Sequence, residues 1–260
     1  MNEHGNRTLT LDAPPAAPPR LRPLYQVDER LAPLYEEIAD CPRCQLARTR
    51  SRTVPGSGPA SARLMLIGEG PGQQEDELGL PFVGRAGQFL DELLATIGLA
   101  RGDVYVANVV KCRPPGNRDP LPEELAACSG YLDRQIAIVD PRVIATLGRF
   151  SMARWFADAR ISRIHGQVAR FEERTVIAMY HPAAALRNPA LRDVMRQDFA
   201  RIPALLEDAP ARSADVSHAP PVLTHEPPAQ PTHPAPDADA LTEEALDAPV
   251  WRDPPQERLL

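Results

Sequence analysis

Apolar and polar positions alternate in two different periods between residues 25 and 207. Four short runs are rich in β-branched and aliphatic residues, at 63–68, 104–110, 142–148 and 175–181. Between and after these runs lie amphipathic patterns of helical period, at residues 86–98, 122–139, 149–157 and 189–207. The short runs predict β-strands, and the longer patterns predict helices that bury one side.

This order of elements predicts an α/β fold, a three-layer α/β/α sandwich with a central four-stranded parallel sheet. Strands that alternate with helices pair in parallel, and the helices cover both faces of the sheet. Ligands of such folds bind beyond the carboxyl ends of the strands. Four unusual features follow strands in this chain: GEGPG after the first, Asn108 at the end of the second, Gly148-Arg149 after the third, and His181-Pro182 after the fourth.

The two ends of the chain lack either period and are crowded with proline. Residues 208–260 hold 11 of the 30 prolines, and the first 24 residues include APPAAPPRLRP. Such composition is typical of disorder. We therefore predict one folded domain at residues 25–207 between disordered extensions at 1–24 and 208–260. The end of the acidic tail, VWRDPPQERLL, is either a peptide for a repair or replication protein or a plain extension.

Charge is distributed unevenly along the chain. Residues 208–260 carry ten acids and three arginines, a net charge of −7, so residues 1–207 are near +1 although the whole chain is −6. The predicted domain is therefore compatible with a polyanionic partner. No run of 18 apolar residues and no signal-peptide pattern is present. We expect a cytoplasmic protein that does not bind membranes and is a monomer.

Four cysteines form two pairs. Cys41 and Cys44 make a C-x2-C motif in CPRC, and Cys112 and Cys128 flank a proline-rich loop that runs into a predicted helix. In a reducing compartment four cysteines are not expected to form disulfides. Four thiolates suit a structural zinc ion or an iron–sulfur cluster. Free buried cysteines are the alternative.

The first loop has unusual chemistry for its position. Residues 68–87 read GEGPGQQEDELGLPFVGRAG, with six glycines and no lysine. A phosphate-binding loop requires a lysine, and the carboxylates of Glu69, Glu75, Asp76 and Glu77 repel phosphate. The glycines of this loop, Gly68 and Gly70 among them, instead allow a flat neutral group to approach the backbone.

Three further residues belong to the same predicted edge of the sheet. Phe82 either stacks on a ligand or packs within its own loop. Asn108 is unusual at a strand end, because a buried amide requires partners. Its donor and acceptor match the edge of a pyrimidine base. His181 is either a structural histidine or a catalytic group.

Together these motifs resemble one enzyme family. GEGPGQQEDELGLPFVGRAG, NVVKCRPPGNRDPLPEELAAC and HPAAALRNP, with CPRC upstream, resemble the family 4 uracil-DNA glycosylases, the iron–sulfur branch of that superfamily. The similarity runs from about residue 35 to 206 in the family's order and cysteine spacing.

The resemblance implies a role for each motif. Cys41, Cys44, Cys112 and Cys128 would hold a 4Fe-4S cluster, with zinc as the alternative metal. Glu69, with the backbone of Gly68 and Gly70, would approach the uracil, Phe82 would stack on it, and Asn108 would read its edge. His181 would donate to uracil O2, while Glu69 or Glu75 would orient water.

The loop after His181 resembles the family's intercalating loop. Leu186 or Arg187 would be the wedge that replaces the flipped base, with plain loop packing as the alternative. The predicted activity is hydrolysis of the uracil N-glycosidic bond in DNA, which leaves an abasic site for base-excision repair. The alternative is a non-catalytic iron–sulfur or zinc module that recognises damaged or single-stranded DNA.

Two related branches differ in their motifs. One has apolar residues where this chain has Glu69. The other forms a covalent histidine adduct through a basic insertion ending in RIH after the second strand. Here RIHG lies at residues 163–166, between the third and fourth predicted strands. We therefore expect His165 to be an ordinary histidine.

Overall fold

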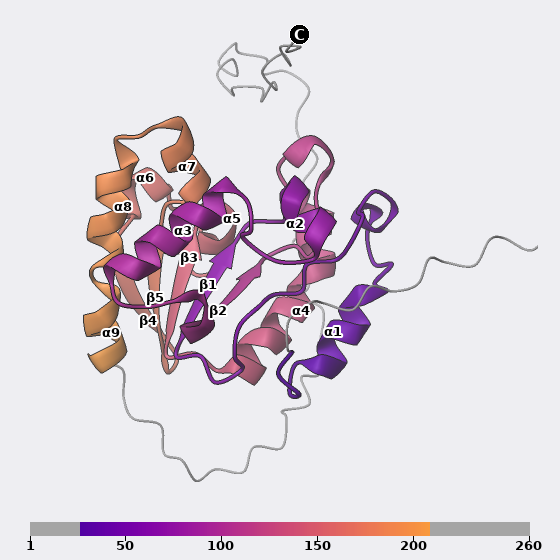
Figure 1. The fold of residues 1–260 in the computed structure, drawn as a ribbon, viewed down its shortest axis with the longest axis horizontal. Helices are drawn as coiled ribbons and strands as arrows, with labels where there is room; N and C mark the ends of the chain where they lie inside the picture. Colours follow the sequence, from indigo (N-terminus) through magenta and orange to yellow (C-terminus); the bar gives the residue numbers. More distant parts are fainter. Residues whose placement is uncertain (1–26, 209–260) are drawn as a thin grey trace, which may run out of the picture.

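The computed structural model describes residues 27–208, which surround one five-stranded sheet (Figure 1). The strands are β1 (Leu64–Gly68), β2 (Val104–Asn108), β3 (Val143–Leu147), β4 (Val168–Phe171) and β5 (Arg174–Met179). Their order in the sheet is β2-β1-β3-β5-β4. All pairs among β1, β2, β3 and β5 are parallel, as the sequence predicts.

The predicted count of four strands is wrong, because β4 adds an antiparallel strand at one edge of the sheet. It pairs with β5 through a tight hairpin in which Phe171 faces Arg174. Only partly buried or exposed residues make up β4, so its apolar signal is weak. Its turn also lacks the Asn-Gly or Asp-Gly sequence that usually marks a hairpin. Glu172 adopts the positive φ, of 53°, that such a turn requires.

The helices lie on both sides of the sheet, and alternate strand residues face the two sides. Leu64 and Leu66 of β1 contact one hydrophobic cluster, while Met65 and Ile67 contact the other. The first cluster includes residues of α3 (Arg85–Thr96), α7 (Pro182–Arg187), α8 (Leu191–Phe199) and α9 (Ile202–Asp208). The second includes residues of α1 (Ala32–Ala39) and α4 (Pro122–Val139). The predicted three layers are therefore present in the described residues (Figure 1).

The last predicted helix, residues 189–207, is two helices in the structure. Helix α8 ends at Phe199 and α9 begins at Ile202. Pro203 explains the break, because proline has no N–H for the preceding turn but is tolerated in the first turn of a new helix. The predicted helix at 149–157 is also shorter, as α5 covers only Arg149–Met152.

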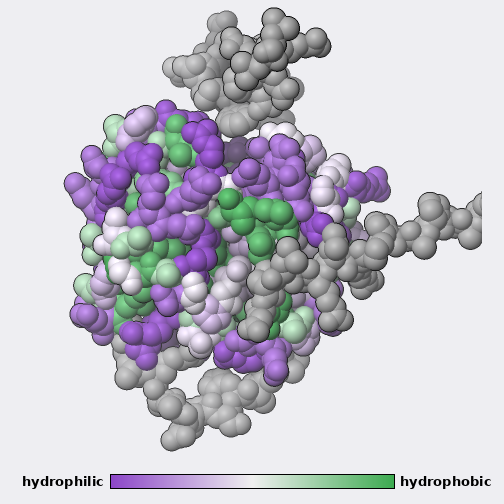
Figure 2. All heavy atoms as spheres, viewed as in Figure 1, coloured by the Kyte–Doolittle hydropathy of each residue, from purple (hydrophilic) through white to green (hydrophobic). Residues whose placement is uncertain are grey.

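Short helices not predicted from the sequence connect the larger elements. They are α2 (Gln73–Leu78), α6 (Ile161–Ile164), and the 3-10 turns η1 (Gln45–Arg48), η2 (Arg101–Asp103) and η3 (Pro115–Asn117). Hydrophilic side chains cover much of the surface over α3 and α8 (Figure 2). Within residues 27–208, no helix has the length and apolarity to cross a membrane. The predicted extensions lie outside the described residues, except Asp208, which ends α9.

Candidate active site at the carboxyl edge of the sheet

A cavity of about 350 Å³ opens at the carboxyl ends of β1, β2 and β5. Its position follows from the register, because Gly68 pairs with Asn108 at the ends of β1 and β2. The residues that line it are Glu69, Gly70, Pro71, Gly72, Glu75, Phe82, Ala86, Asn108, Pro114, Asn117, Arg118, Asp119, Arg149, His181, Ala183 and Arg187. The structure thus brings together Glu69, Gly70, Glu75, Phe82, Asn108, His181 and Arg187, all of which the sequence analysis selects.

Gly68 does not line the cavity but is required behind it. A Cβ atom at this position would lie 2.4 Å from Asn108 Oδ1 and 2.6 Å from the Phe82 ring. These distances are too short for any side chain, so glycine lets the Asn108 amide and the Phe82 ring approach the end of β1. Glycine is therefore needed at this position because the side chains of the cavity wall pack directly against its backbone.

Phe82 adopts a left-handed backbone conformation, with φ of 54°, which is strained for an aromatic residue. Two features accommodate this conformation. Arg101 donates to the Phe82 carbonyl at 3.0 Å, and Gly87 lacks the Cβ atom that would lie 1.7 Å from the same oxygen. The ring is only 6% exposed and stacks on His181, with 5.5 Å between centroids. Phe82 therefore both packs in the core and forms one wall of the cavity.

The Asn108 side chain is buried, at 1% exposure, and its Oδ1 atom has no hydrogen-bond partner among the described residues. Leaving a buried acceptor unpaired costs about 1–3 kcal/mol. Such a cost is typical of sites that a ligand completes. Asn108 also lines the cavity, so its side-chain amide lies at the surface that a bound molecule would contact.

His181 is held as a neutral donor. Its Nδ1 atom accepts a hydrogen bond from the Ala183 backbone N–H at 3.1 Å, so the ring proton belongs on Nε2. Burial, with a smaller contribution from the charge of Arg187, lowers the pKa of His181 to about 4. At neutral pH the imidazole therefore carries no charge and offers one N–H.

Glu69 has the opposite shift. Burial and then the charge of Asp119 raise the pKa of Glu69 to about 7, although Arg149 and Arg187 act against this rise. No hydrogen bond to the Glu69 carboxyl is formed by any described residue. The group can therefore gain or lose a proton near neutral pH, as a general base requires.

Two other carboxylates of the glycine-rich loop, those of Glu75 and Asp76, accept hydrogen bonds from backbone N–H groups. Glu75 Oε1 accepts from Val83 at 2.9 Å and from Gly84 at 2.8 Å, which closes the loop that carries Phe82. Asp76 is 3% exposed, and its two oxygens accept from Ser51 N–H at 3.0 Å. Both acids lie in the first turn of α2, where the helix dipole favours negative charge. Both acids therefore stabilise the fold of the loop, a role that the sequence pattern did not reveal.

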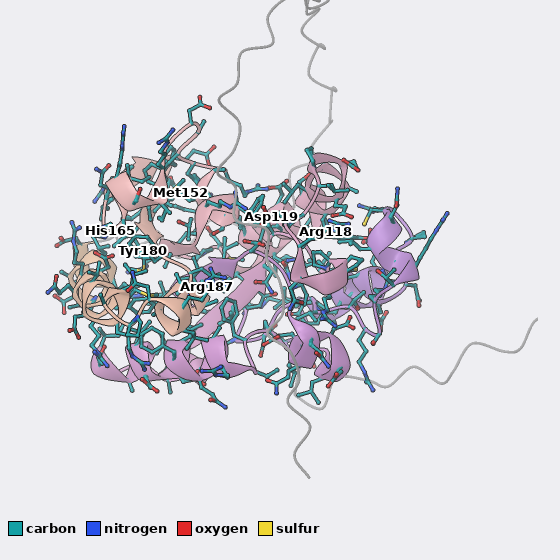
Figure 3. All side chains as sticks on the ribbon, turned by 90° about the horizontal axis from the view of Figure 1, so that it is seen from above. Arg118, Asp119, Met152, His165, Tyr180 and Arg187 are labelled. Atoms are coloured by element: carbon teal, nitrogen blue, oxygen red, sulfur yellow. The ribbon has the colours of Figure 1, made fainter. Side chains whose placement is uncertain are left out.

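Two charged residues at the mouth of the cavity, Arg118 and Asp119, were missed from the sequence, whereas Arg149 was noted only as following a strand. Arg118 and Asp119 come from the loop before α4, and Arg149 begins α5; Figure 3 shows Arg118 and Asp119 side by side, with Arg187 nearby. Arg149 pairs with Asp119 in an ion pair, and Arg118 binds both oxygens of the buried Glu124 at 2.7 and 2.9 Å. The sequence GNRD, residues 116–119 of the loop between β2 and α4, is the signal that could have identified them.

The two predicted wedge residues differ in position. Both lie on the short helix α7 and not on an irregular loop. Arg187 is exposed and lines the cavity, whereas Leu186 is half-buried and does not line it. His165 also lies outside the cavity lining, where its Nδ1 bonds Asp198 at 3.0 Å and its ring contacts Tyr180 (Figure 3).

The four cysteines gather in one hydrophobic cluster beside α1 and α4. Cys112 and Cys128 are buried, and Cys41 and Cys44 pack against them. Two donors point at sulfur: Arg50 Nη1 lies 3.3 Å from Cys112 Sγ, and the Lys111 backbone N–H lies 3.3 Å from Cys128 Sγ. Burial raises the pKa of Cys112 to about 11, so a positive partner is needed to make its thiolate stable.

None of the four cysteines forms a disulfide. Within the described residues, no three His, Cys, Asp or Glu side chains are arranged to hold a single metal ion. A zinc ion binds sulfur at about 2.3 Å and therefore requires its four thiolates to be tightly grouped. Four thiols in one cluster, with N–H donors facing two of them, are the ligand type of both structural zinc sites and iron–sulfur centres.

Comparison with known proteins agrees with the site. The model of the uracil DNA glycosylase superfamily matches residues 55–202. The type-4 uracil-DNA glycosylase of Sulfurisphaera tokodaii is 45% identical over 184 residues, which cover 67% of this chain and 84% of that protein. That of Archaeoglobus fulgidus is 46% identical over 183 residues, covering 67% and 92%.

More distant relatives carry a related name. The type-5 uracil-DNA glycosylase of Thermus thermophilus is 38% identical over 117 residues, which cover 39% of this chain and 53% of that protein. The family match spans more than half of the chain and includes the cavity residues Glu69, Asn108 and His181. This chain belongs to the uracil DNA glycosylase superfamily.

Proposed function

We propose that this protein is a uracil-DNA glycosylase of the type-4 group, which hydrolyses the N-glycosidic bond of uracil in DNA and leaves an abasic site. The observation that carries the proposal is the pair formed by Asn108 and His181. One offers a buried acceptor without a partner, and the other offers a neutral N–H donor, at the same cavity. Relatives that are 41–46% identical and named type-4 uracil-DNA glycosylases support it.

Uracil must leave the duplex before it can enter the cavity. Flipping a base costs a few kcal/mol of stacking and pairing. Arginines at the mouth, Arg118, Arg149 and Arg187, offset this cost by binding the backbone phosphates on either side. The exposed position of Arg187 favours it over Leu186 as the side chain that enters the duplex.

Inside the cavity the base is recognised by shape and by hydrogen bonds. Phe82 stacks on one face of the ring, and Gly70 allows the base to approach the backbone. Asn108 Oδ1 accepts the hydrogen of uracil N3, while its amide nitrogen donates to a uracil carbonyl. Cytosine has no N3 hydrogen, so it leaves the Asn108 acceptor unpaired.

Cleavage places negative charge on the uracil ring as the bond to C1′ of the sugar breaks. His181 Nε2–H donates to O2 as this charge develops, and a preorganised donor of this kind contributes about 3 kcal/mol. The Glu69 carboxylate accepts a proton from water, whose oxygen bonds to C1′. Glu75 is less suited to this step, because one of its oxygens already binds two backbone N–H groups.

We propose that Cys41, Cys44, Cys112 and Cys128 hold a 4Fe-4S cluster with a structural role, with zinc as the alternative. When bound, the cluster would supply positive charge to buried thiolates and tie the segment before β1 to the loop after β2. A brown protein with visible absorbance and stoichiometric iron supports the cluster. A colourless protein with stoichiometric zinc supports the alternative.

The activity is tested by incubating the purified protein with a uracil-containing oligonucleotide, followed by alkali, which breaks the strand at abasic sites. We expect a break only at uracil, and none in the matched oligonucleotide that contains thymine. Binding of uracil-containing DNA without a break would support the non-catalytic module instead. We also propose that the protein acts as a monomer in the cytoplasm, where reduced thiols persist.

A further inference from the structure

Lys111 is the lone lysine of the chain, and it is buried directly behind the candidate site. Its side chain is 1% exposed, and no carboxylate of residues 27–208 lies within salt-bridge distance of it. The Nζ atom donates to the Asn108 carbonyl at 2.7 Å and to Gln135 Oε1 at 2.6 Å. Burying an ammonium group without a carboxylate partner is costly, and Cys112 and Cys128 offer it negative charge only as thiolates, so packing alone does not explain a lysine here.

The backbone around Lys111 connects the cavity to the cysteine cluster over five residues. Strand β2 ends at Asn108, and the next two residues bond across to the glycine-rich loop. Val109 N–H donates to the Gly68 carbonyl at 3.0 Å, and Val110 N–H donates to the Glu69 carbonyl at 3.1 Å. Cys112 then joins the cysteine cluster. The position of this bend therefore sets the positions of Asn108 and Glu69.

Gln135 fixes the other side of the Lys111 ammonium group. It lies on α4, is fully buried, and its Nε2 donates to the Pro55 carbonyl at 2.7 Å and to Tyr105 Oη at 2.9 Å. Lys111 Nζ is thus held between the sheet and α4. Its hydrogen bond to the Asn108 carbonyl therefore restrains the backbone at the end of β2, because Lys111, Asn108 and Gln135 are all buried.

We propose that Lys111 is a positioning residue for base recognition, which locks the bend between Asn108 and the cysteine cluster so that the Asn108 amide and Glu69 face the base. This inference rests on the proposed glycosylase activity. Lys111 touches neither the cavity nor the reacting atoms, and it acts through the Asn108 backbone. Without the ammonium donor the Asn108 carbonyl loses a buried partner, and the bend has other arrangements available.

The test compares Lys111→Met and Gln135→Met with Leu132→Ala in the full-length protein. Methionine keeps the unbranched chain of Lys111, one atom shorter, but removes its donor. Leu132 is a fully buried residue of the same helix as Gln135, and its truncation lowers stability without touching Asn108. Each protein is measured for visible absorbance per chain, thermal unfolding, and single-turnover cleavage of uracil-containing DNA below the unfolding range.

Binding supplies a readout that does not depend on activity. The probes are two duplexes, one with the non-cleavable 2′-fluoro-2′-deoxyuridine and one with thymidine at the same position. We expect Lys111→Met to slow cleavage at least tenfold and to reduce the preference for the uracil analogue about fivefold or more, with unchanged binding of the thymidine duplex. Gln135→Met should change both in the same direction but less, and Leu132→Ala should change neither.

The results separate failure of this inference from failure of the proposed function. A wild-type protein that does not cleave uracil-containing DNA contradicts the function itself. An active wild type with a normal rate and preference in Lys111→Met overturns the positioning role, as does an equal loss in Leu132→Ala. If Lys111→Met does not fold or lacks the absorbance, Gln135→Met decides, and a normal rate and preference in that variant overturns the proposal.

Discussion

Two carboxylates of the glycine-rich loop lie in opposite surroundings. At its start, Glu69 faces the cavity, receives no hydrogen bond from the described residues, and has a pKa raised to about 7. Seven residues later, Asp76 is almost fully buried, and backbone N–H groups of Ser51 and Arg52 point at its oxygens. The same residue class therefore serves chemistry where it lacks partners and stability where it has them.

The same contrast extends to the neighbours of each group. Asn108 has a buried acceptor without a partner and His181 keeps its Nε2–H for the cavity, like Glu69. Glu75 resembles Asp76, because it binds backbone N–H groups that close the loop under Phe82. Substitutions in the first set should change the reaction, and those in the second set should change the fold.

The largest effect on rate should come from the cavity donor. We expect His181→Ala to lower the single-turnover rate of uracil release at least a hundredfold, because about 3 kcal/mol of stabilisation of the anionic uracil is lost. The variant should stay folded at the assay temperature, although loss of the acceptor for the Ala183 N–H lowers its stability by about 1 kcal/mol. His165→Ala is the matched control, since His165 lies outside the cavity lining. Equal losses of rate in the two variants would contradict the role of His181.

The next largest effect should appear in the stability of a variant at Asp76. Asp76→Ala leaves the Ser51 N–H without its acceptor, so we expect the free energy of unfolding to fall by about 2–3 kcal/mol in urea titrations. The rate per folded molecule should stay within about fivefold of the wild type. A hundredfold loss of rate in a fully folded Asp76→Ala protein would contradict the distinction between a reactive Glu69 and a structural Asp76.

Glu69 should give a pH effect of intermediate size. If the carboxylate accepts the proton from water, the rate should rise with pH through about 7 and then become constant, because burial places the pKa there. Glu69→Gln should be at least tenfold slower above neutral pH and should lack this rise. A pH profile of the same shape in both proteins would exclude Glu69 as the base.

The stability of the same variant should move in the opposite direction to its activity. The folded-state pKa of Glu69 is raised, so its protonation stabilises the fold below the usual value of 4.5, and this contribution is lost as pH rises through about 7. Glutamine stays neutral at every pH. Glu69→Gln should therefore be more stable than the wild type above about pH 8 and nearly equal to it at about pH 4. Unfolding in urea at the two pH values measures the difference.

The smallest effect should come from the mouth of the cavity. Arg187→Ala removes one exposed positive charge, so binding of uracil-containing DNA should weaken a few-fold and the salt slope of log affinity should fall by about one. Arg196→Ala is the control, because Arg196 lies on α8 and pairs with Asp193. An unchanged salt slope in Arg187→Ala would show that Arg187 makes no phosphate contact.

The sequence pattern was sufficient for those features that depend on order along the chain. Strands alternating with helices predicted the parallel pairing of four strands, and the rule that ligands bind at their carboxyl ends led to Asn108 and His181. The composition of the glycine-rich loop drew attention to Glu69 and Phe82, and the resemblance supplied their roles. The register of β1 and β2 then brings both to the same cavity. None of these predictions required a contact between distant side chains.

The features that were missed depend on contacts that no local pattern contains. From the sequence, the acids of α2 could not be told apart from Glu69. The backbone N–H groups that bind them lie up to 25 residues away along the chain. Arg149 meets Asp119 only because β3 and the loop after β2 end at the same edge. Strand β4 depends on its neighbour β5 and carries a weak apolar signal of its own.

The most direct test of the uracil pocket changes the base that it reads. Asn108→Asp replaces the amide with a carboxylate, which can accept from the amino group of cytosine but offers no amide donor to a uracil carbonyl. We predict that the ratio of single-turnover rates on uracil and cytosine, in otherwise identical DNA, falls at least tenfold. A ratio equal to that of the wild type, in a folded protein, would show that Asn108 does not read the base.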